Sequence, residues 1–332
     1  MRPTAAFVLL AAALGLAHPS ARAEVGPGER PPAFEGKEFL NIGKCDLKSL
    51  RGHVVLLEVF RTWCHVCREQ APHMNEIWAQ YKDKGLVVLG ITNENKTLVD
   101  AFVAKSTANY PIVMESTDSA TALAVGGYPH CFLIGPDGKI AWHDTMFTPG
   151  AQQALLDDLL AKQLIAPKLP EKLGAVQKLL DKSKYADARK ALVAAAAGKL
   201  SDDEKKAADE MVAWIDASGT SLVASATADD AAGNALDAAE TFADVAADYA
   251  GLEPGTKAAD GLKALLADPA KKKEIDAAKA LAKAKEAARG EPAKKALLLF
   301  KPLVSKWKGT KAGDKAAAIV TELEAKEAKA GK

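Results

Sequence analysis

The sequence predicts an α/β domain followed by an all-α domain, because the two halves of the chain differ in pattern. From about residue 32 to residue 163, short runs of Val, Ile and Leu alternate with stretches whose apolar residues recur at helical spacing. This alternation is typical of strands and helices packed in layers. Beyond residue 173 the chain is rich in Ala, Lys, Asp and Glu, and strand signals are nearly absent. The 332 residues, 48% of them hydrophobic, can bury more than one core.

The first 23 residues have the pattern of a secretory signal peptide. Arg2 is followed by an apolar run over residues 5–17 and by the small-residue motif Ala21-Arg22-Ala23. As a helix that run would rise only ~20 Å, against a hydrocarbon core of ~30 Å, so the pattern favours cleavage over anchoring. We expect a periplasmic or otherwise secreted protein that is soluble after signal cleavage.

Residues 24–163 are predicted to form the α/β domain, residues 164–173 a linker, and residues 174–332 the helical domain. The linker contains Pro167 and Pro170 among polar residues. All four cysteines precede it, so the redox chemistry that an oxidising compartment permits belongs to the first domain.

Within the α/β domain, β-type runs and helical spacing place each element. Pro136-Asp137-Gly138 lies between two apolar runs and predicts a hairpin turn. Thr148-Pro149 fits an N-cap and first helical position. The predicted strands are Val54–Phe60, Leu86–Ile91, Cys131–Ile134 and Lys139–His143, and the predicted helices are Glu69–Tyr81, Leu98–Lys105 and Thr148 to about Gln163.

The helical domain contains two segments that look alike. Phe242–Tyr249 is followed by Gly255-Thr256-Lys257-Ala258, and Phe300–Trp307 is followed by Gly309-Thr310-Lys311-Ala312. The pattern is consistent with degenerate helical hairpins similar to tetratricopeptide-type arrays, although no 34-residue period is present. A simple helical bundle is the favoured interpretation of the two, because aromatic residues at helical spacing more often fill a core than form a ligand site. A capping box at Ser201 and Glu204 marks one helix start.

Cys64-His65-Val66-Cys67 carries the predicted chemistry. Thiol-disulfide exchange needs one activated thiol and a second thiol within reach, and a helix that begins at Cys64 would provide both. Haem attachment needs His after the second cysteine, where Arg68 stands, and no second pair of ligands completes a zinc site. We expect no metal and no cofactor beyond the redox-active Cys64–Cys67 disulfide.

A longer set of residues resembles a known family. Trp63 precedes the Cys pair, Pro72 follows it by five residues, and Gly127-Tyr128-Pro129 with Pro136-Asp137-Gly138 follows downstream. These motifs, within residues 34–163, resemble the thioredoxin-like branch that includes TlpA- and ResA-type periplasmic thiol-disulfide oxidoreductases. The resemblance implies a thioredoxin-like fold with a central mixed sheet flanked by helices. It does not extend to the helical half.

The resemblance also implies roles for individual residues. Cys64 would be the nucleophile and Cys67 the resolving cysteine, with Trp63 beside them as a substrate-binding aromatic residue. Pro129 would be a cis proline facing the disulfide. Glu58 would be a buried proton shuttle for Cys67, the alternative being an exposed position at a strand edge.

Three residues depart from the family or tune its chemistry. Tyr128, a candidate substrate-binding residue, is bulkier than the residue that usually precedes this proline in the family. The family's substrate preference is therefore not assigned to this protein. Cys131 stands where a small hydroxyl residue is usual in the family. It either forms a structural disulfide with Cys45 or remains a buried free thiol. A protonated His65 would stabilise the Cys64 thiolate and so the reduced form of the pair, which would make the protein an oxidant. The family resemblance instead implies a reductase.

The sequence therefore predicts a protein-disulfide oxidoreductase, with reduction as the favoured direction. Its expected partners are protein thiols or disulfides and a membrane or periplasmic electron donor or acceptor, and the helical domain is a candidate site for a protein partner. The net charge of +1 gives no electrostatic attraction to nucleic acid, so no nucleic-acid partner is expected. The alternatives are a binding or scaffold protein whose CxxC is structural, and a copper-handling thioredoxin-like protein.

Overall fold

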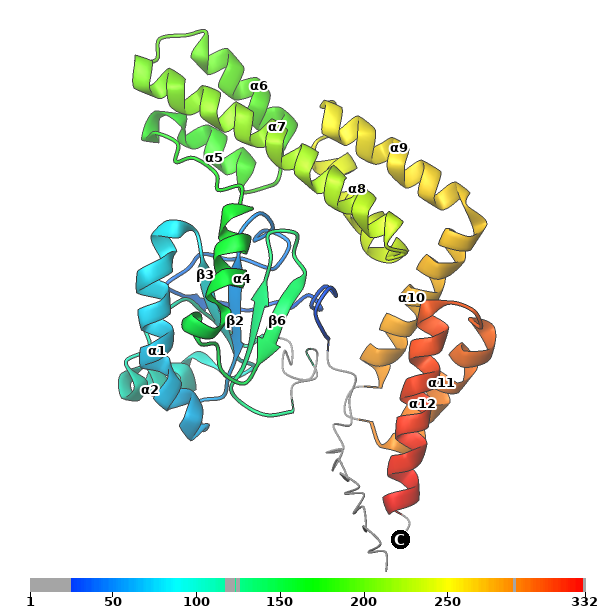
Figure 1. Cartoon of the computed structure of the whole chain (residues 1–332). Coiled ribbons are helices and arrows are strands. Elements are labelled where there is room, and N and C mark those ends of the chain that lie inside the picture. Colours follow the sequence, from blue (N-terminus) through cyan, green and yellow to red (C-terminus); the bar gives the residue numbers. More distant parts are fainter. Residues whose placement is uncertain (1–24, 117–122, 124–125, 289–290, 331–332) are drawn as a thin grey trace, which may run out of the picture.

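The computed structural model describes residues 25–116, 123, 126–288 and 291–330 (Figure 1). The predicted signal peptide at residues 1–23 lies outside the described residues. The first half forms a six-stranded mixed sheet with helices, and the second half is helical. The strands are β1 (Glu38–Leu40), β2 (Val55–Val59), β3 (Val87–Ile91), β4 (Ile112–Met114), β5 (His130–Ile134) and β6 (Ile140–Asp144), and the accompanying helices are α1 (His65–Tyr81), η1 (Lys82–Lys84), α2 (Lys96–Ser106) and α4 (Pro149–Ala161).

The sheet has the order β1-β4-β3-β2-β5-β6, which places β2 at its centre. β2 pairs parallel with β3 and antiparallel with β5, so the sheet is mixed, as the thioredoxin-like prediction requires. All five residues of β2 are buried. A central strand covered on both faces is a continuous apolar run, so the one carboxylate inside it, Glu58, is an exception to the pattern.

The two faces of the sheet have separate hydrophobic cores. Along β2, Leu56 packs in the core formed with α1, α2 and α4, whereas Val55 and Leu57 pack in the core on the opposite face. Because successive side chains of a strand point to opposite faces, Glu58 lies on the same face as Leu56, toward α1. This alternation decides which residues surround the Cys64–Cys67 pair.

Two short strands were not predicted. β1 and β4 have three residues each and pair with one another, and β1 is partly exposed. Three residues are too few to reveal an alternating pattern. α1 begins at His65 with Cys64 as its N-cap, as the prediction of a helix start at Cys64 requires, and it extends four residues ahead of the helical spacing that begins at Glu69.

The helical half continues directly from the segment predicted as a linker. Trp214 donates from Nε1 to the Leu164 carbonyl oxygen at 2.7 Å, and Leu169 packs against the helical core. No helix in the described ranges is long and apolar enough to cross a membrane. The helices are η2 (Glu171–Leu173), α5 (Gly174–Leu180), α6 (Tyr185–Ala196), α7 (Asp202–Ala231), α8 (Ala235–Asp248), α9 (Glu253–Ala267), α10 (Pro269–Ala287), α11 (Ala293–Lys306) and α12 (Lys311–Ala330). The predicted capping box of Ser201 and Glu204 is confirmed at the start of α7.

These helices form an arc rather than one compact bundle (Figure 1). One hydrophobic cluster extends from α5 to Ile275 of α10, and a second joins Leu281 of α10 to α11 and α12. Successive helices pack on their neighbours. Two hydrophobic clusters, and not one shared core, therefore hold these helices together.

The two similar sequence segments form the hairpins α8–α9 and α11–α12, but in a different register from the predicted one. A Cβ atom on Gly255 would collide with the carbonyl group of Tyr249, and a Cβ on Gly313 would collide with that of Trp307. The glycine that corresponds to Gly255 is therefore Gly313, and its predicted alignment with Gly309 is wrong by about one helical turn. Close approach of the two helices, and not a turn, requires glycine here.

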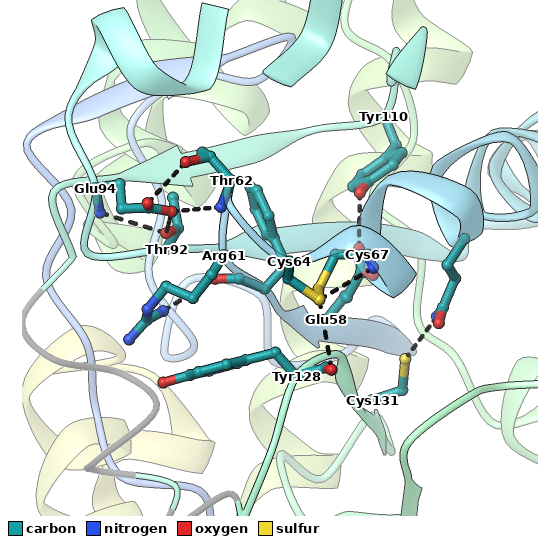
Figure 2. The surroundings of a disulfide bond; sticks show 12 residues. Glu58, Arg61, Thr62, Cys64, Cys67, Thr92, Glu94, Tyr110, Tyr128 and Cys131 are labelled. Atoms are coloured by element: carbon teal, nitrogen blue, oxygen red, sulfur yellow. Dashed lines mark hydrogen bonds between the residues drawn. A yellow bond between two sulfur atoms is a disulfide. The ribbon is translucent and has the colours of Figure 1, made fainter. Parts of the chain in front are cut away.

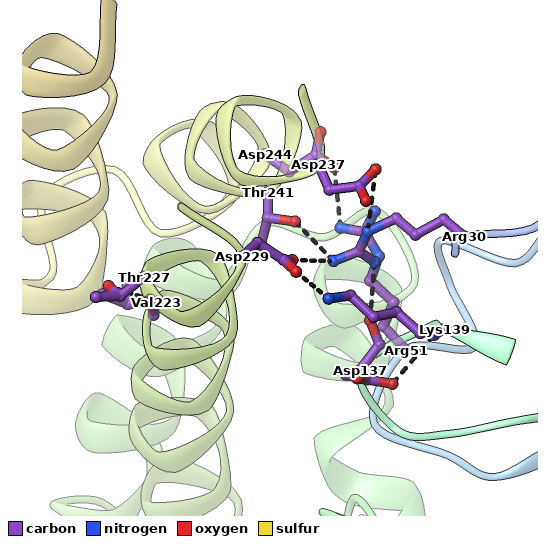
Figure 3. Close-up of polar contacts among 10 residues, drawn as sticks. All are labelled: Arg30, Arg51, Asp137, Lys139, Val223, Thr227, Asp229, Asp237, Thr241 and Asp244. Carbon is purple, nitrogen blue, oxygen red and sulfur yellow. Dashed lines mark hydrogen bonds and ion pairs between the residues drawn. The ribbon is translucent and has the colours of Figure 1, made fainter. Parts of the chain in front are cut away.

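Opposite charges connect the two halves around a buried carboxylate (Figure 3). Asp229 of α7 is fully buried and pairs with Lys139 and with Arg30, whose Nη2 lies 3.3 Å from Asp229 Oδ2. Arg30 also donates to Thr241 Oγ1 of α8 at 3.1 Å. Both cations are themselves mostly buried, with 12% and 18% of their side chains exposed.

A second, more exposed group of charges extends this interface. Lys48 Nζ lies 2.9 Å from Asp244 Oδ1 and 3.6 Å from Asp248 Oδ2, and Arg51 Nη1 lies 3.2 Å from Asp244 Oδ2. In both groups the bases come from the α/β half and the acids from α7 or α8. We define these contacts together as the interdomain ion cluster.

Asp229→Asn is expected to destabilise the protein by ~3–5 kcal/mol. Lys139 would be left buried without its counter-charge, and Arg30 would keep only its longer ion pair with Asp237, in which Nε lies 3.9 Å from Oδ1. The measurement is the free energy of unfolding in urea, followed by near-UV and far-UV circular dichroism. Asp216→Asn is the matched control, since Asp216 and Arg189 form an ion pair with side chains 44% and 35% exposed, which is worth less than ~1 kcal/mol. Equal losses in the two variants would contradict a dominant role for the buried cluster.

Candidate active site

The Cys64–Cys67 pair lies where β2 leads into α1 (Figure 2). Cys64 is the N-cap of α1, and its Sγ accepts a hydrogen bond from the Cys67 N–H at 3.1 Å. The two cysteines form a disulfide with a Cα–Cα distance of 5.3 Å. Cys64 is 6% exposed and Cys67 is fully buried. The accessible sulfur therefore sits at the helix N-terminus, where unpaired N–H groups favour a thiolate.

The loop that carries Cys64 is anchored by Glu94, which the sequence analysis did not identify. Glu94 Oε2 accepts a hydrogen bond from the Thr62 N–H at 2.6 Å, and Oε1 accepts one from the Thr62 hydroxyl at 2.7 Å. Thr92 Oγ1 donates to Glu94 at 3.1 Å. Glu94 follows β3, and only the parallel pairing of β2 with β3 brings it beside Thr62, so no local sequence signal indicates this contact.

Glu58 lies in the middle of the central strand, fully buried and not at an exposed edge. Its Oε2 accepts a hydrogen bond from the Tyr110 hydroxyl at 2.7 Å, while Oε1 has no partner. Burial raises the pKa of Glu58 to about 7, and the Tyr110 hydrogen bond opposes that increase. A carboxyl group with this pKa can accept and release a proton near neutral pH.

Cys131 lies directly opposite Glu58 in the pairing of β5 with β2. Its buried Sγ accepts a hydrogen bond from Gln70 Nε2 at 3.3 Å. Burial, together with the nearby Glu58 carboxylate, raises the pKa of the Cys131 thiol far above its usual range. Cys131 is therefore a buried neutral thiol in the core that also contains Cys64 and Cys67.

The structure does not contain the disulfide between Cys45 and Cys131 that the sequence left open. Both are free thiols. Cys131 faces the α1 side of the sheet, whereas Cys45 packs against the core on the opposite face. The sheet itself separates them, and sequence spacing carries no information about which face each one occupies.

The predicted substrate-binding residues gather around Cys64. The Tyr128–Pro129 peptide bond is cis. Cys64 Sγ lies 3.5 Å from the Tyr128 carbonyl oxygen. Trp63 is 69% exposed, and its ring meets the Tyr128 ring edge-on with centroids 5.9 Å apart. These contacts place an aromatic surface next to the one accessible sulfur of the pair.

His65 is exposed to solvent and pairs with an acid on its own helix. Its side chain is 72% exposed, and Nε2 lies 3.1 Å from Glu69 Oε1, one turn along α1. The structure thus places the residue on the solvent side of the helix, next to an acid. Across the described ranges, no group of three or more His, Cys, Asp or Glu side chains is arranged to hold a metal ion.

Comparison with known proteins agrees with this geometry. Residues 27–143 match the family model described as AhpC/TSA family. Thiol-disulfide oxidoreductase ResA of Geobacillus thermodenitrificans is 32% identical over 148 residues, which are 41% of this chain and 82% of that protein. The chain belongs to the ResA-like thiol-disulfide oxidoreductases.

Other relatives of this ResA-like chain cover a similar region. ResA of Bacillus cereus is 34% identical over 120 residues, and the match spans 34% of this chain and 66%, just under two thirds, of the relative. Among solved structures, a thiol:disulfide interchange protein DsbE from Chlorobium tepidum is 29% identical with a TM-score of 0.34, over 42% of this chain and 98% of that one. Each of these two matches spans less than half of this chain.

Proposed function

We propose that this protein reduces disulfides in exported proteins through Cys64 and Cys67. The Cys64 thiolate attacks a substrate disulfide, forms a mixed disulfide and releases one substrate thiol. Cys67 then attacks Cys64 Sγ, which releases the second substrate thiol and leaves the Cys64–Cys67 disulfide. The single observation that carries this proposal is the pair itself, with Cys64 accessible at a helix N-terminus and Cys67 buried behind it.

Glu58 is proposed as the proton acceptor for the resolving step. Cys67 must lose its proton before it attacks, and a fully buried thiol has no direct contact with water. Glu58 faces the α1 side of the sheet, and its pKa of about 7 suits reversible proton transfer. Its unpartnered Oε1 is the oxygen that would take up the proton.

A measurement of the reduction potential of the Cys64–Cys67 pair would test whether the protein acts as a reductase or as an oxidant. A reductase should have a potential of about −270 mV, as in thioredoxin, whereas a strong oxidant has a potential of about −120 mV. The oxidised protein is equilibrated with glutathione or dithiothreitol buffers, and the reduced fraction is quantified by thiol alkylation and mass spectrometry. A pair that stays oxidised in every buffer, with no reduction of a protein disulfide such as that of insulin, would favour a structural CxxC.

We also propose that the protein is exported and that a membrane or periplasmic donor re-reduces the pair. The support is the signal-peptide pattern of residues 1–23 and the need of a reductase for electrons after each turnover. The mass of the protein recovered from an expressing bacterium should correspond to a chain that begins at Glu24.

The helical domain is proposed to recognise a protein partner, since the interdomain ion cluster holds it against the redox domain.

A further inference from the structure

The Tyr128 ring, next to the cis proline, contacts two side chains of the loop that precedes Cys64, and Figure 2 shows one of them, Arg61. The Arg61 guanidinium carbon lies 4.4 Å from the centroid of the Tyr128 ring, which is a cation–π contact. Trp63 meets the same ring edge-on at 5.9 Å. Arg61 is only 6% exposed, and water therefore screens this contact weakly.

The backbone that enters Tyr128 has little packing of its own. Gly126 and Gly127 precede it, and both are exposed. A Cβ atom added to Gly127 would meet nothing within 4 Å. Glycine has the largest conformational freedom of any residue, and the Tyr128 side chain, through its contacts with Arg61 and Trp63, supplies packing that these two glycines lack.

Arg61 is itself firmly held. Its Nη1 donates to the Phe60 carbonyl oxygen at 2.9 Å. The next residue, Thr62, is bound through its N–H and its hydroxyl by Glu94. The chain of contacts therefore runs from Glu94 through Thr62 and Arg61 to Tyr128, whose carbonyl oxygen lies 3.5 Å from Cys64 Sγ.

We propose that Arg61 is a positioning residue for substrate docking, which holds the Tyr128 ring and thereby the Tyr128 carbonyl beside Cys64. The inference rests on the proposed function, because it concerns how a polypeptide substrate is aligned with the nucleophile. Arg61 does not touch the reacting sulfur atoms. Its loss should therefore weaken the docking of a protein substrate and leave the chemistry of the Cys64–Cys67 pair unchanged.

Arg61→Ala is expected to raise KM for insulin about fivefold, which corresponds to the loss of one partly buried cation–π contact. The value of kcat should stay within about twofold of that of the original protein. Two readouts separate positioning from general damage. The Cys64–Cys67 reduction potential and the rate with a small aromatic disulfide, Ellman's reagent, should both stay unchanged. Arg61→Lys should recover part of the loss, because a lysine ammonium also binds an aromatic face. Arg189→Ala, which removes an arginine of the helical half, is the matched control.

A double-mutant cycle keeps the test decisive if Arg61→Ala also perturbs the fold. Tyr128→Phe retains the ring, and the fivefold effect of Arg61→Ala should persist in that background. Tyr128→Leu removes the ring, and the effect should then disappear. An unchanged KM in Arg61→Ala, or an equal effect of Arg61→Ala in the Phe and Leu backgrounds, would overturn the inference. Failure of the original protein to reduce insulin at all would instead overturn the proposed function.

Discussion

Replacing Cys64 by serine is expected to lower the rate of insulin disulfide reduction by about 1,000-fold or more, because only a thiolate can attack the substrate disulfide. Cys64 is the more accessible member of the pair, 6% exposed against 0% for Cys67, and the N-cap of α1, so the fully buried Cys67 is not placed to replace it as nucleophile. The measurement is the turbidity of insulin reduced in the presence of dithiothreitol, with the initial rate compared at equal protein concentration.

Cys45→Ser is the matched control for this loss. Cys45 is a free thiol on the opposite side of the sheet, and burial raises its pKa to about 11. Its substitution should leave the rate unchanged within about twofold. Full activity in Cys64→Ser would remove the basis of the proposed function and would favour the scaffold alternative.

The companion variant Cys67→Ser separates the two steps of the reaction. Cys64 can still attack, but no buried thiol remains to resolve the product, so mixed disulfides with substrate should accumulate. Non-reducing gel electrophoresis after acid quenching detects them as higher-mass species that disappear with reductant. Their absence from Cys67→Ser, combined with normal turnover, would show that resolution uses another thiol.

Replacing Glu58 by glutamine is expected to raise stability at pH 8 by roughly 3 kcal/mol. The pKa of Glu58 is about 7 in the folded protein, against an ordinary value of 4.5, and each pKa unit corresponds to ~1.4 kcal/mol. Between these two values the folded state binds more protons than the unfolded state. Stability of the original protein should therefore fall as pH rises from about 4.5 to 7 and level off above that range.

The glutamine variant should lack this fall, because its side chain does not titrate. The measurement is the free energy of unfolding in urea at pH 5, 6, 7 and 8. Glu76→Gln is the control, since Glu76 lies on α1 with 81% of its side chain exposed. The same pH slope in the original protein and in Glu58→Gln would contradict a buried carboxyl group that ionises near neutral pH.

Glu58→Gln should also slow the resolution of mixed disulfides, since glutamine cannot accept the Cys67 proton. The slowing is expected to be about 100-fold, in the range typical of one lost acid–base group. Because the carboxylate form is the acceptor, the difference between the original protein and the variant should grow as pH rises through about 7. Stopped-flow measurement of single-turnover thiol release at several pH values gives this rate directly.

Much of the redox site was predictable from short stretches of sequence. The apolar run Val54–Phe60 indicated a buried strand, and its one carboxylate, Glu58, stood out because burial of a charge is costly. The CxxC spacing predicted a disulfide at a helix start, which Cys64 and Cys67 form. Pro129 was expected to be cis only because of the family resemblance, and its bond is cis.

Contacts between distant segments were not predictable in the same way. Glu94 reaches Thr62 only because β3 lies beside β2. The pairing of Arg61 with Tyr128 depends on β5 lying on the other side of β2. The hairpin register in the helical half was wrong by about a turn, because what requires glycine is the approach of two helices and not the local chain.

The sequence by itself therefore determined the local features of this protein: the strands and helices with strong periodicity, the CxxC pair and the composition of the two halves. Local periodicity and the spacing of the two cysteines depend only on residues within one or two helical turns of each other, so they can be predicted from the amino-acid sequence. The tertiary structure alone decided that Cys45 and Cys131 lie on opposite faces of the sheet, that Arg61 holds Tyr128, and that Asp229 joins the two halves. These outcomes depend on the strand order β1-β4-β3-β2-β5-β6 and on the docking of α7 and α8, which bring together residues that are far apart along the chain.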